Sequence, residues 1–174
     1  MADRIEQTAR AAFQGDPVAA AQLAEFLCPD VDDSVRMALA MWSRKVARPA
    51  FASFLKVAWS FEHRAMLQAL GTRKARCMWR YAQPELALPS SGAVRIFRGT
   101  RGVSVAAAAR GLSWTLDRSV ARFFAQQAIS TGAPFEGKPL VIAAEVPSNA
   151  LAYLGGEESE AIATRYVRSA RAES

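Results

Sequence analysis

The chain has 174 residues, 51% of them apolar, and a formal net charge of +6. This length accommodates one domain or two small lobes, and the apolar content is enough to bury a core, which excludes a disordered chain. No run of about 18 consecutive apolar residues occurs, so the sequence excludes a transmembrane helix and we expect no membrane partner.

The start of the chain and its few metal-binding residue types narrow the class of protein further. The N-terminal stretch MADRIEQTARAAFQGD lacks the charged start, apolar stretch and cleavage site of a secretory signal. We therefore expect a cytoplasmic protein, and delivery by a route that needs no such signal stays open. Cys28, Cys77 and the single His63 follow no zinc-binding spacing, so we expect two thiols buried in helices, a structural histidine and no metal.

Residues 1–85 are predicted to form a helical lobe, because they are rich in Ala, Leu, Met, Phe and Trp and contain few glycines. Asp16 and Pro17 are typical of a helix start, an N-cap followed by proline at the first helical position. The expected helices cover about 2–14, 17–27, a third segment opened by Asp32, Asp33 and Ser34, a fourth from Pro49 to Gly71, and 72–82.

Basic residues gather near the end of this helical lobe, at Arg73, Lys74, Arg76 and Arg80. Such a cluster is typical of a solvated helix face. It also suits an acidic partner such as RNA, DNA or a negatively charged protein surface, and both interpretations stay open here.

The Pro, Ser and Gly residues of PELALPSSG (84–92) predict a loop, and we place a linker at 86–92 and a second lobe at 93–174. Short β-like segments alternate with helical ones in this lobe, which predicts a small mixed sheet and an α+β chain. Strands are expected at 93–100, 111–115, 139–146 and, as one strand or a pair, 157–167. Helical segments are expected at 103–110 and 118–129, the second capped by Asp117 and packed through Val120, Phe123 and Phe124. Loops are expected at 130–138 and 147–156.

Polar residues recur on three of the predicted strands. Arg98 ends an apolar strand beside a glycine, where a guanidinium can grip a phosphate while the backbone approaches a ligand closely. Ser113 and Thr115 share one face of a short strand, and Glu158 and Glu160 share one face of a late strand about 7 Å apart. Each pattern alone is also typical of an exposed strand, so the argument depends on their order.

The ordered set of IFRGT, GLSWT and EESEAI resembles the Arg-Ser-Glu class of ADP-ribosyltransferases, which includes binary-toxin enzymes and arginine-modifying transferases. The resemblance covers about residues 93–167, under half of the chain. Where the family usually has Ser-Thr-Ser, this chain has Ser113-Trp114-Thr115, so the first hydroxyl is kept and the middle residue departs from the pattern.

The resemblance implies an NAD-dependent mono-ADP-ribosyltransferase with NAD as co-substrate. Glu160 would hold the ribose 2′-hydroxyl and support the oxocarbenium-like transition state, and Glu158 would orient or deprotonate the acceptor. Arg98 would bind the NAD phosphates or brace the nicotinamide ribose. The Gly99 backbone would bind the nicotinamide amide, and Ser113, which also contacts NAD, would hold Glu160 in place.

The same resemblance extends the expected contacts of NAD and of the acceptor. Thr115 joins the NAD-binding residues, and Phe123 or Phe124 is the candidate for the aromatic residue near the nicotinamide, with core packing as the alternative for both. The loop over 147–157 would touch the acceptor. Its residues with that expected role are Tyr153, Gly155 and Gly156.

Several alternatives for the acceptor and for the activity stay open. A glutamate at the first position of Glu-x-Glu implies, in this family, an arginine acceptor in a protein, whereas the positive net charge favours RNA or DNA. NAD hydrolysis and a small acceptor are further alternatives, and a toxin, a phage-encoded host modifier and a regulator all suit such an enzyme. In the helical lobe, Trp79 or Tyr81 is a candidate to reach the nucleotide. Two alternatives to an active enzyme also stay open. One is an inert module that binds through its basic helical lobe, and the other is an unrelated α+β domain.

Overall fold

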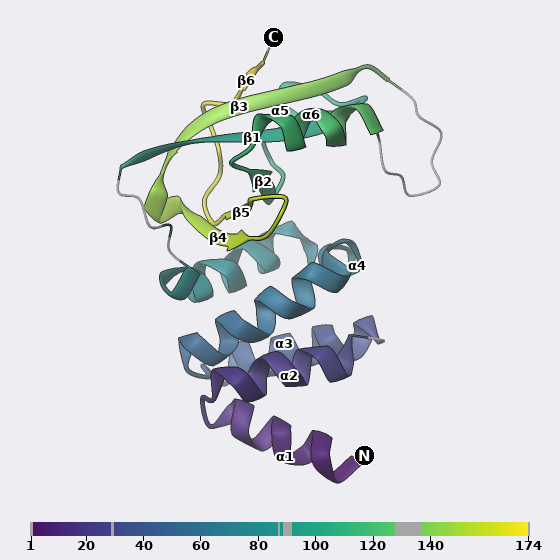
Figure 1. Cartoon of the computed structure of the whole chain (residues 1–174), viewed down its shortest axis with the longest axis vertical. Helices are drawn as coiled ribbons and strands as arrows, with labels where there is room; N and C mark the ends of the chain where they lie inside the picture. The colour runs from purple at the N-terminus through teal and green to yellow at the C-terminus, as the bar shows by residue number, and fades with distance from the viewer. Residues whose placement is uncertain (1, 29, 87, 89–91, 128–136, 174) are drawn as a thin grey trace. The chain divides into compact units, whose positions relative to one another are not determined.

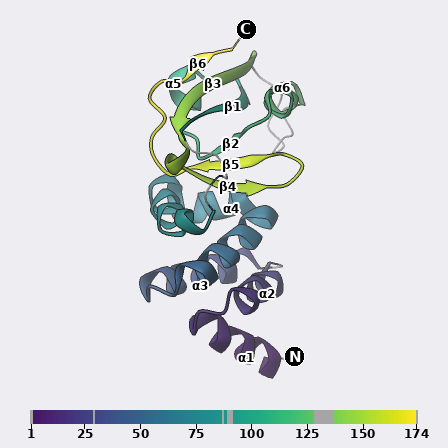
Figure 2. The same cartoon turned by 60° about the vertical axis from the view of Figure 1, so that its left-hand side comes forward.

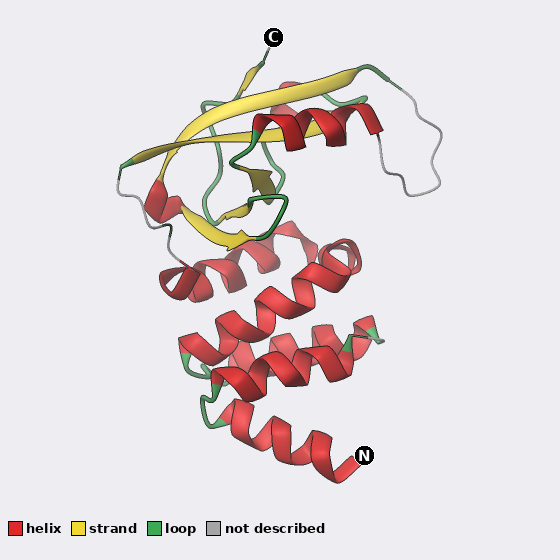
Figure 3. Ribbon diagram, in the orientation of Figure 1, coloured by secondary structure: helices red, strands yellow, loops and turns green. Residues whose placement is uncertain are grey.

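The computed structural model describes residues 2–28, 30–86, 88, 92–127 and 137–173 and divides the chain into two compact units (Figure 1). We call Met1–Leu86 the helical unit and Ala87–Ser174 the sheet unit. Figure 3 shows helices in the first and a sheet with short helices in the second, which confirms the predicted α+β class. Most of the predicted linker 86–92 lies outside the described residues. Within the described ranges, no helix combines the length and the apolar character needed to cross a membrane.

The helical unit contains α1 (Ala2–Phe13), α2 (Pro17–Leu27), α3 (Val31–Ser43), α4 (Arg48–Ala82) and the 3-10 turn η1 (Gln83–Leu86). The Asp16 side chain accepts hydrogen bonds from the N–H groups that open α2, which confirms the predicted start of that helix. Helix α3 begins earlier than predicted, because Asp30 rather than Asp32 is the capping side chain.

Helix α4 is a long run whose helical geometry is interrupted twice. Gly71 has a φ of +72°, so helical geometry breaks at the predicted glycine. Glu62 has a φ of −138° and carries no glycine or proline signal in the sequence, so this second break was not predicted. Phe51, Phe54, Trp59 and Trp79 of α4 are buried, and the two tryptophans meet edge to face with ring centroids 5.4 Å apart, whereas Phe61 is exposed.

The basic cluster at the end of α4 is not a uniform solvated face. Arg73, Lys74 and Arg80 are exposed, whereas Arg76 is 2% exposed. The interpretation of all four cations as one surface patch is therefore wrong for Arg76. Arg73 and Lys74 lie on the exposed surface, as contact with an acidic partner requires.

Other side chains of the helical unit also differ from expectation. Cys28 is half-buried and Cys77 is exposed, and both are free thiols, so the prediction of two buried thiols is wrong. Trp79 is 1% exposed, and the Tyr81 hydroxyl donates a hydrogen bond to the Val46 carbonyl oxygen at 2.8 Å. Trp79 also meets Trp59 edge to face, so both aromatic side chains have contacts within the helical unit.

The sheet unit is a six-stranded sheet in the order β4-β5-β2-β1-β3-β6, and every pairing among its described residues is antiparallel rather than mixed as predicted. The predicted loop at 130–138 lies almost entirely outside the described residues. The elements are β1 (Ala93–Arg101), α5 (Val105–Ala108), β2 (Ser113–Thr115), α6 (Arg118–Gln127), β3 (Pro139–Pro147), the 3-10 turn η2 (Ser148–Ala150), β4 (Leu151–Gly155), β5 (Glu160–Ala163) and β6 (Arg171–Ala172).

Strand β4 occupies a segment that the sequence predicts as loop. It pairs with β5 in the register Leu151 with Ala163 and Tyr153 with Ala161. The segment follows Pro147 and Asn149 and ends in two glycines, which are loop signals, and it becomes a strand because β5 offers it a partner. The prediction of a loop over 147–156 is therefore wrong beyond η2.

Different elements cover the two faces of the sheet at β1. Ile96 belongs to a buried cluster that includes α5, while Phe97 on the opposite face packs with Ala121 of α6. Figure 2 shows α5 and α6 on opposite sides of β1 and β3. Helix α6 packs through Ala121 and Ala125, whereas Phe123 is 45% exposed, so the prediction that Phe123 packs the helix is wrong.

Candidate functional site

Neighbouring strands bring Arg98, Ser113 and Glu160 together. They lie on β1, β2 and the start of β5, and β2 lies between the other two strands in the sheet. The Ser113 hydroxyl donates a hydrogen bond to Oε1 of Glu160 at 2.6 Å, the length of a bond to a charged acceptor. Arg98 Nη1 donates a hydrogen bond to the Ser113 carbonyl oxygen. We call these residues the triad.

The guanidinium of Arg98 is largely withdrawn from water. Burial lowers the pKa of Arg98, and the nearby Glu160 carboxylate acts in the opposite direction. The Nε atom of Arg98 is buried, and no described residue accepts a hydrogen bond from it. Holding a cation in this way has a free-energy cost, which is typical of a group kept for binding or catalysis.

Gly111 adjoins the Arg98 guanidinium and was not predicted as a site residue. A Cβ atom at Gly111 would lie 2.3 Å from Cζ of Arg98, so only glycine leaves this space free. The Trp114 indole N–H donates a hydrogen bond to the Gly111 carbonyl oxygen at 3.2 Å, and Trp114 is 2% exposed. The residue that departs from the family motif therefore tethers the backbone beside Arg98.

Glu158 lies on a turn, not on the predicted strand. Residues 156–159 form the turn between β4 and β5, and Ser159 has a φ of +46°, which breaks the strand geometry. The expectation that Glu158 and Glu160 share one strand face is therefore wrong. Glu158 is exposed beside the triad residue Glu160, and its carbonyl oxygen accepts a hydrogen bond from the Thr115 hydroxyl at 2.6 Å.

Thr115 and Gly99, expected at the cofactor, have other contacts. The Thr115 hydroxyl has a single proton, which it donates to Glu158, and it accepts the Asp117 N–H at 3.0 Å. A Cβ atom at Gly99 would lie 1.8 Å from the Ala121 carbonyl oxygen, so the close approach of α6 requires this glycine. These contacts give both residues structural roles in the sheet unit.

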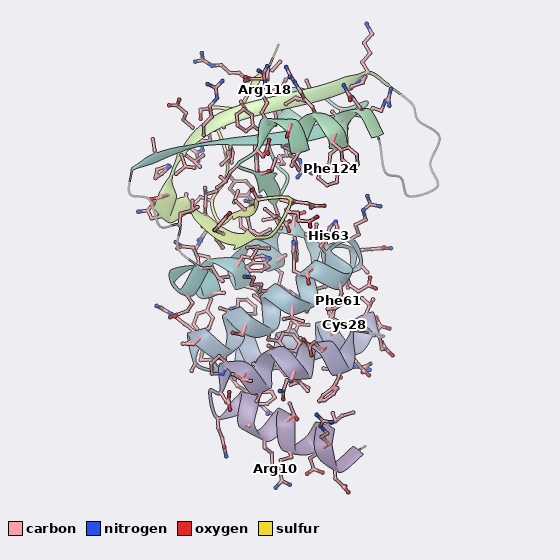
Figure 4. The ribbon with its side chains drawn as sticks, in the orientation of Figure 1. Arg10, Cys28, Phe61, His63, Arg118 and Phe124 are labelled. Atoms are coloured by element: carbon pink, nitrogen blue, oxygen red, sulfur yellow. The ribbon has the colours of Figure 1, made fainter. Side chains whose placement is uncertain are left out.

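The aromatic candidates and the acceptor segment lie on α6 and on the β4–β5 hairpin. Phe123 and Phe124 meet edge to face with centroids 5.8 Å apart, and Figure 4 shows Phe124 projecting from α6. Tyr153 is half-buried on β4, where it packs against the core. Gly155 and Gly156, with φ of +75° and +76°, end β4 and open the turn. The expected acceptor loop is therefore a hairpin.

Within the described residues, the triad coincides with neither a metal-binding group nor the apolar cleft of the sheet unit. Among the described residues, no three His, Cys, Asp or Glu side chains are grouped so that they could hold a metal ion. His63 lies on α4, where its ring centroid is 6.0 Å from that of Trp59 (Figure 4). An apolar cleft in the sheet unit is lined by residues outside the triad, including Val146, Ala150, Leu151, Ala163, Arg165 and Tyr166.

Comparisons with protein-family models, curated proteins and solved structures gave no match for this chain.

Proposed function

We propose that this chain is a mono-ADP-ribosyltransferase that breaks the nicotinamide–ribose bond of NAD and transfers ADP-ribose to a protein side chain, with arginine favoured. The observation that carries the proposal is the hydrogen bond from Ser113 to Glu160 beside the half-buried Arg98, whose Nε atom is buried. The motifs lie far apart in the sequence and come together on three adjacent strands. Such convergence supports a common role better than three separate surface residues would.

The chemistry assigned to the triad follows from charge development in the reaction. As the glycosidic bond to nicotinamide breaks, positive charge grows on the ribose, and a carboxylate fixed nearby stabilises it. Ser113 fixes Oε1 of Glu160, and we assign the ribose 2′-hydroxyl as a second hydrogen-bond donor to this carboxylate. Arg98 supplies a cation suited to the phosphates of NAD, and its Nε is a donor for which the described residues provide no acceptor.

The turn between β4 and β5 supports a cationic acceptor. Glu157 and Glu158 are both exposed there, next in sequence to the strand that begins with Glu160. Exposed carboxylates attract a guanidinium and repel the phosphates of RNA or DNA. We assign Glu158 the role of general base, which takes the proton from the attacking acceptor. An origin as a toxin or as a host-modifying effector is part of the proposal and rests on the family resemblance.

The deciding experiment follows label from isotopically labelled NAD into a cell lysate. Wild type, Glu160→Gln and Glu145→Gln are compared, because Glu145 is an exposed glutamate of β3 and so gives a matched control. Wild type and Glu145→Gln should label a macromolecule, and Glu160→Gln should lose on the order of 100-fold in rate. Protease and nuclease treatment then distinguish a protein acceptor from RNA or DNA. Equal labelling by all three proteins, or no consumption of NAD by any, would contradict the proposal.

A further inference from the structure

The turn that carries Glu158 is attached to the segment that follows β2. The Thr115 hydroxyl donates to the Glu158 carbonyl oxygen at 2.6 Å, and the Leu116 N–H donates to the Ser159 carbonyl oxygen at 3.1 Å. These bonds join the connection between β2 and α6 to the connection between β4 and β5. Glu158 itself is exposed, so its backbone, rather than packing of its side chain, fixes its position.

The position of the Thr115 hydroxyl is fixed as well. Thr115 is 5% exposed, and its oxygen accepts the Asp117 N–H at 3.0 Å. A hydroxyl that accepts from a backbone N–H must direct its own proton elsewhere, and the Glu158 carbonyl oxygen receives it. Ser159 next to it has a φ of +46°, which a residue other than glycine adopts at a cost in free energy. The bonds from Thr115 and Leu116 therefore add to the hydrogen bond within the turn, from the Ser159 N–H to the Gly156 carbonyl oxygen at 3.1 Å, in holding this shape.

Thr115 and Glu160 are directly opposite each other in the pairing of β2 with β5, but their side chains have different hydrogen-bond partners. The Glu160 carboxylate accepts from the Ser113 hydroxyl, whereas the Thr115 hydroxyl donates to the Glu158 carbonyl oxygen. Loss of the Thr115 hydroxyl removes a bond at Glu158 and leaves the bond at Glu160 in place. Effects on the two glutamates can therefore be measured apart.

We propose that Thr115 is a positioning residue that fixes the Glu158 turn and thereby favours transfer of ADP-ribose to an acceptor over its loss to water. This inference rests on the proposed function. In transfer, the ribose–nicotinamide bond breaks with its electron pair on nicotinamide, a guanidine nitrogen bonds to the ribose carbon, and the nitrogen's proton passes to Glu158 and then to solvent. In hydrolysis, water takes the place of the guanidine. If Glu158 is displaced, Glu160 still supports cleavage of the ribose–nicotinamide bond, but the guanidine nitrogen then captures the ribose carbon more slowly.

The test measures both outcomes with NAD and agmatine, a small guanidine, as the acceptor probe. Nicotinamide release without agmatine reports hydrolysis, and ADP-ribosyl-agmatine reports transfer. Thr115→Val removes the hydroxyl at nearly constant volume, Thr115→Ser restores it, and Glu158→Gln serves as the reference for a lost proton acceptor. We expect Thr115→Val to lower the ratio of transfer to hydrolysis by about five- to tenfold, as Glu158→Gln does, and Thr115→Ser to keep the wild-type ratio.

The outcomes separate the inference from the function it rests on. A Thr115→Val protein that loses both rates in proportion, or neither, overturns the inference and leaves the transferase proposal intact. If the wild type hydrolyses NAD without modifying agmatine, the ratio is measured on the macromolecule labelled in lysate. Hydrolysis with no labelled acceptor of any kind overturns both the inference and the transferase proposal. A wild type that consumes no NAD overturns both. If Thr115→Val fails to fold, Thr115→Ala removes the same hydroxyl without adding a methyl group.

Discussion

At the scale of single residues, the guanidinium of Arg98 depends on a neighbour that has no side chain. The space beside Arg98 Cζ is bordered by Gly111, whose carbonyl oxygen is held by the Trp114 indole. Arg98 in turn donates to the carbonyl oxygen of Ser113. One short backbone segment thus positions both the cation and the serine of the triad.

Gly111→Ala should therefore displace the guanidinium with little change in stability. The new methyl group would overlap the end of a flexible side chain, which can move, rather than backbone, which cannot. We expect NAD to bind on the order of tenfold more weakly, measured by calorimetry, because a charge-assisted contact of Arg98 is lost. Arg98→Ala and the variant with both substitutions complete a double-mutant cycle. The double variant should bind NAD no more weakly than Arg98→Ala, and additive losses of affinity would show that Gly111 acts elsewhere.

The two free thiols should differ in reactivity. Burial raises the pKa of the Cys28 thiol, with further contributions from Glu62 and Glu25, so less of it is thiolate at a given pH. Cys77 is exposed on α4. Iodoacetamide at mildly alkaline pH should modify Cys77 first, as followed by peptide mass spectrometry, and Cys77→Ser should leave one slowly reacting thiol. Faster modification of Cys28 would contradict the structure at this position.

The triad could be predicted from sequence, while its surroundings could not. Arg98, Ser113 and Glu160 have residue types and an order that resemble a family, so pattern alone singles them out. Gly111 matters through the space it leaves beside a side chain on another strand, and no spacing in the sequence encodes that contact. Glu158 was misplaced because an alternating Glu-Ser-Glu predicts a strand, whereas Ser159 adopts a left-handed conformation.

At the scale of elements, α6 lies so close to β1 that its backbone leaves no room for a side chain. A Cβ atom at Gly99 would lie 1.8 Å from the carbonyl oxygen of Ala121 and 2.8 Å from the backbone nitrogen of Ala125. Gly99→Ala should lower the free energy of unfolding by about 3 kcal/mol in urea denaturation, at the upper end of the usual cost of overpacking, because backbone atoms must move. Gly156→Ala is the matched control. Its Cβ meets nothing within 4 Å, and at a φ of +76° it should cost only about 1–2 kcal/mol. Similar losses for the two variants would contradict this packing.

The start of α6 should give a pH-dependent contribution to stability. The Ser119 hydroxyl and N–H donate to the Asp117 carboxylate at 2.6 and 2.7 Å and lower the pKa of Asp117. A lowered pKa in the folded protein stabilises it above the unfolded value of about 3.9, and this stabilisation is lost as the pH falls through the folded value. Asp117→Asn keeps a capping oxygen without the charge. The difference in urea midpoint between wild type and this variant should shrink below about pH 4, and a constant difference would contradict the assignment.

Whether an element could be predicted depended on where its signal lies. Helix α2 was predicted at its first residue because Asp16 and Pro17 encode the start locally. Strand β4 was missed because its backbone bonds are made to β5, and the sequence around it reads as turn. The class of the sheet unit followed from the alternation of segments, and the antiparallel order of its strands depends on pairings between distant residues.

At the scale of the whole molecule, the helical unit has an apolar core of its own. Trp59 and Trp79 pack edge to face on α4, and α2 packs against α4. Large side chains that are fully buried in this unit are Leu23, Met41, Phe51, Phe54, Leu55, Met66 and Met78. The helical unit is long enough to bury the apolar surface that a domain needs to fold by itself.

The isolated fragment 1–86 should therefore fold by itself. We expect a helical circular dichroism spectrum and a single cooperative urea transition, followed by tryptophan fluorescence, with an m-value of about 1 kcal/mol per molar urea. Leu23→Ala in the same fragment is the control for a packed core, because Leu23 is 0% exposed and its truncation should cost about 2–5 kcal/mol. A broad transition that Leu23→Ala leaves unchanged would show that the helical unit needs the sheet unit to fold. Nicotinamide release from NAD should be absent in this fragment, because Arg98, Ser113 and Glu160 all lie in the sheet unit.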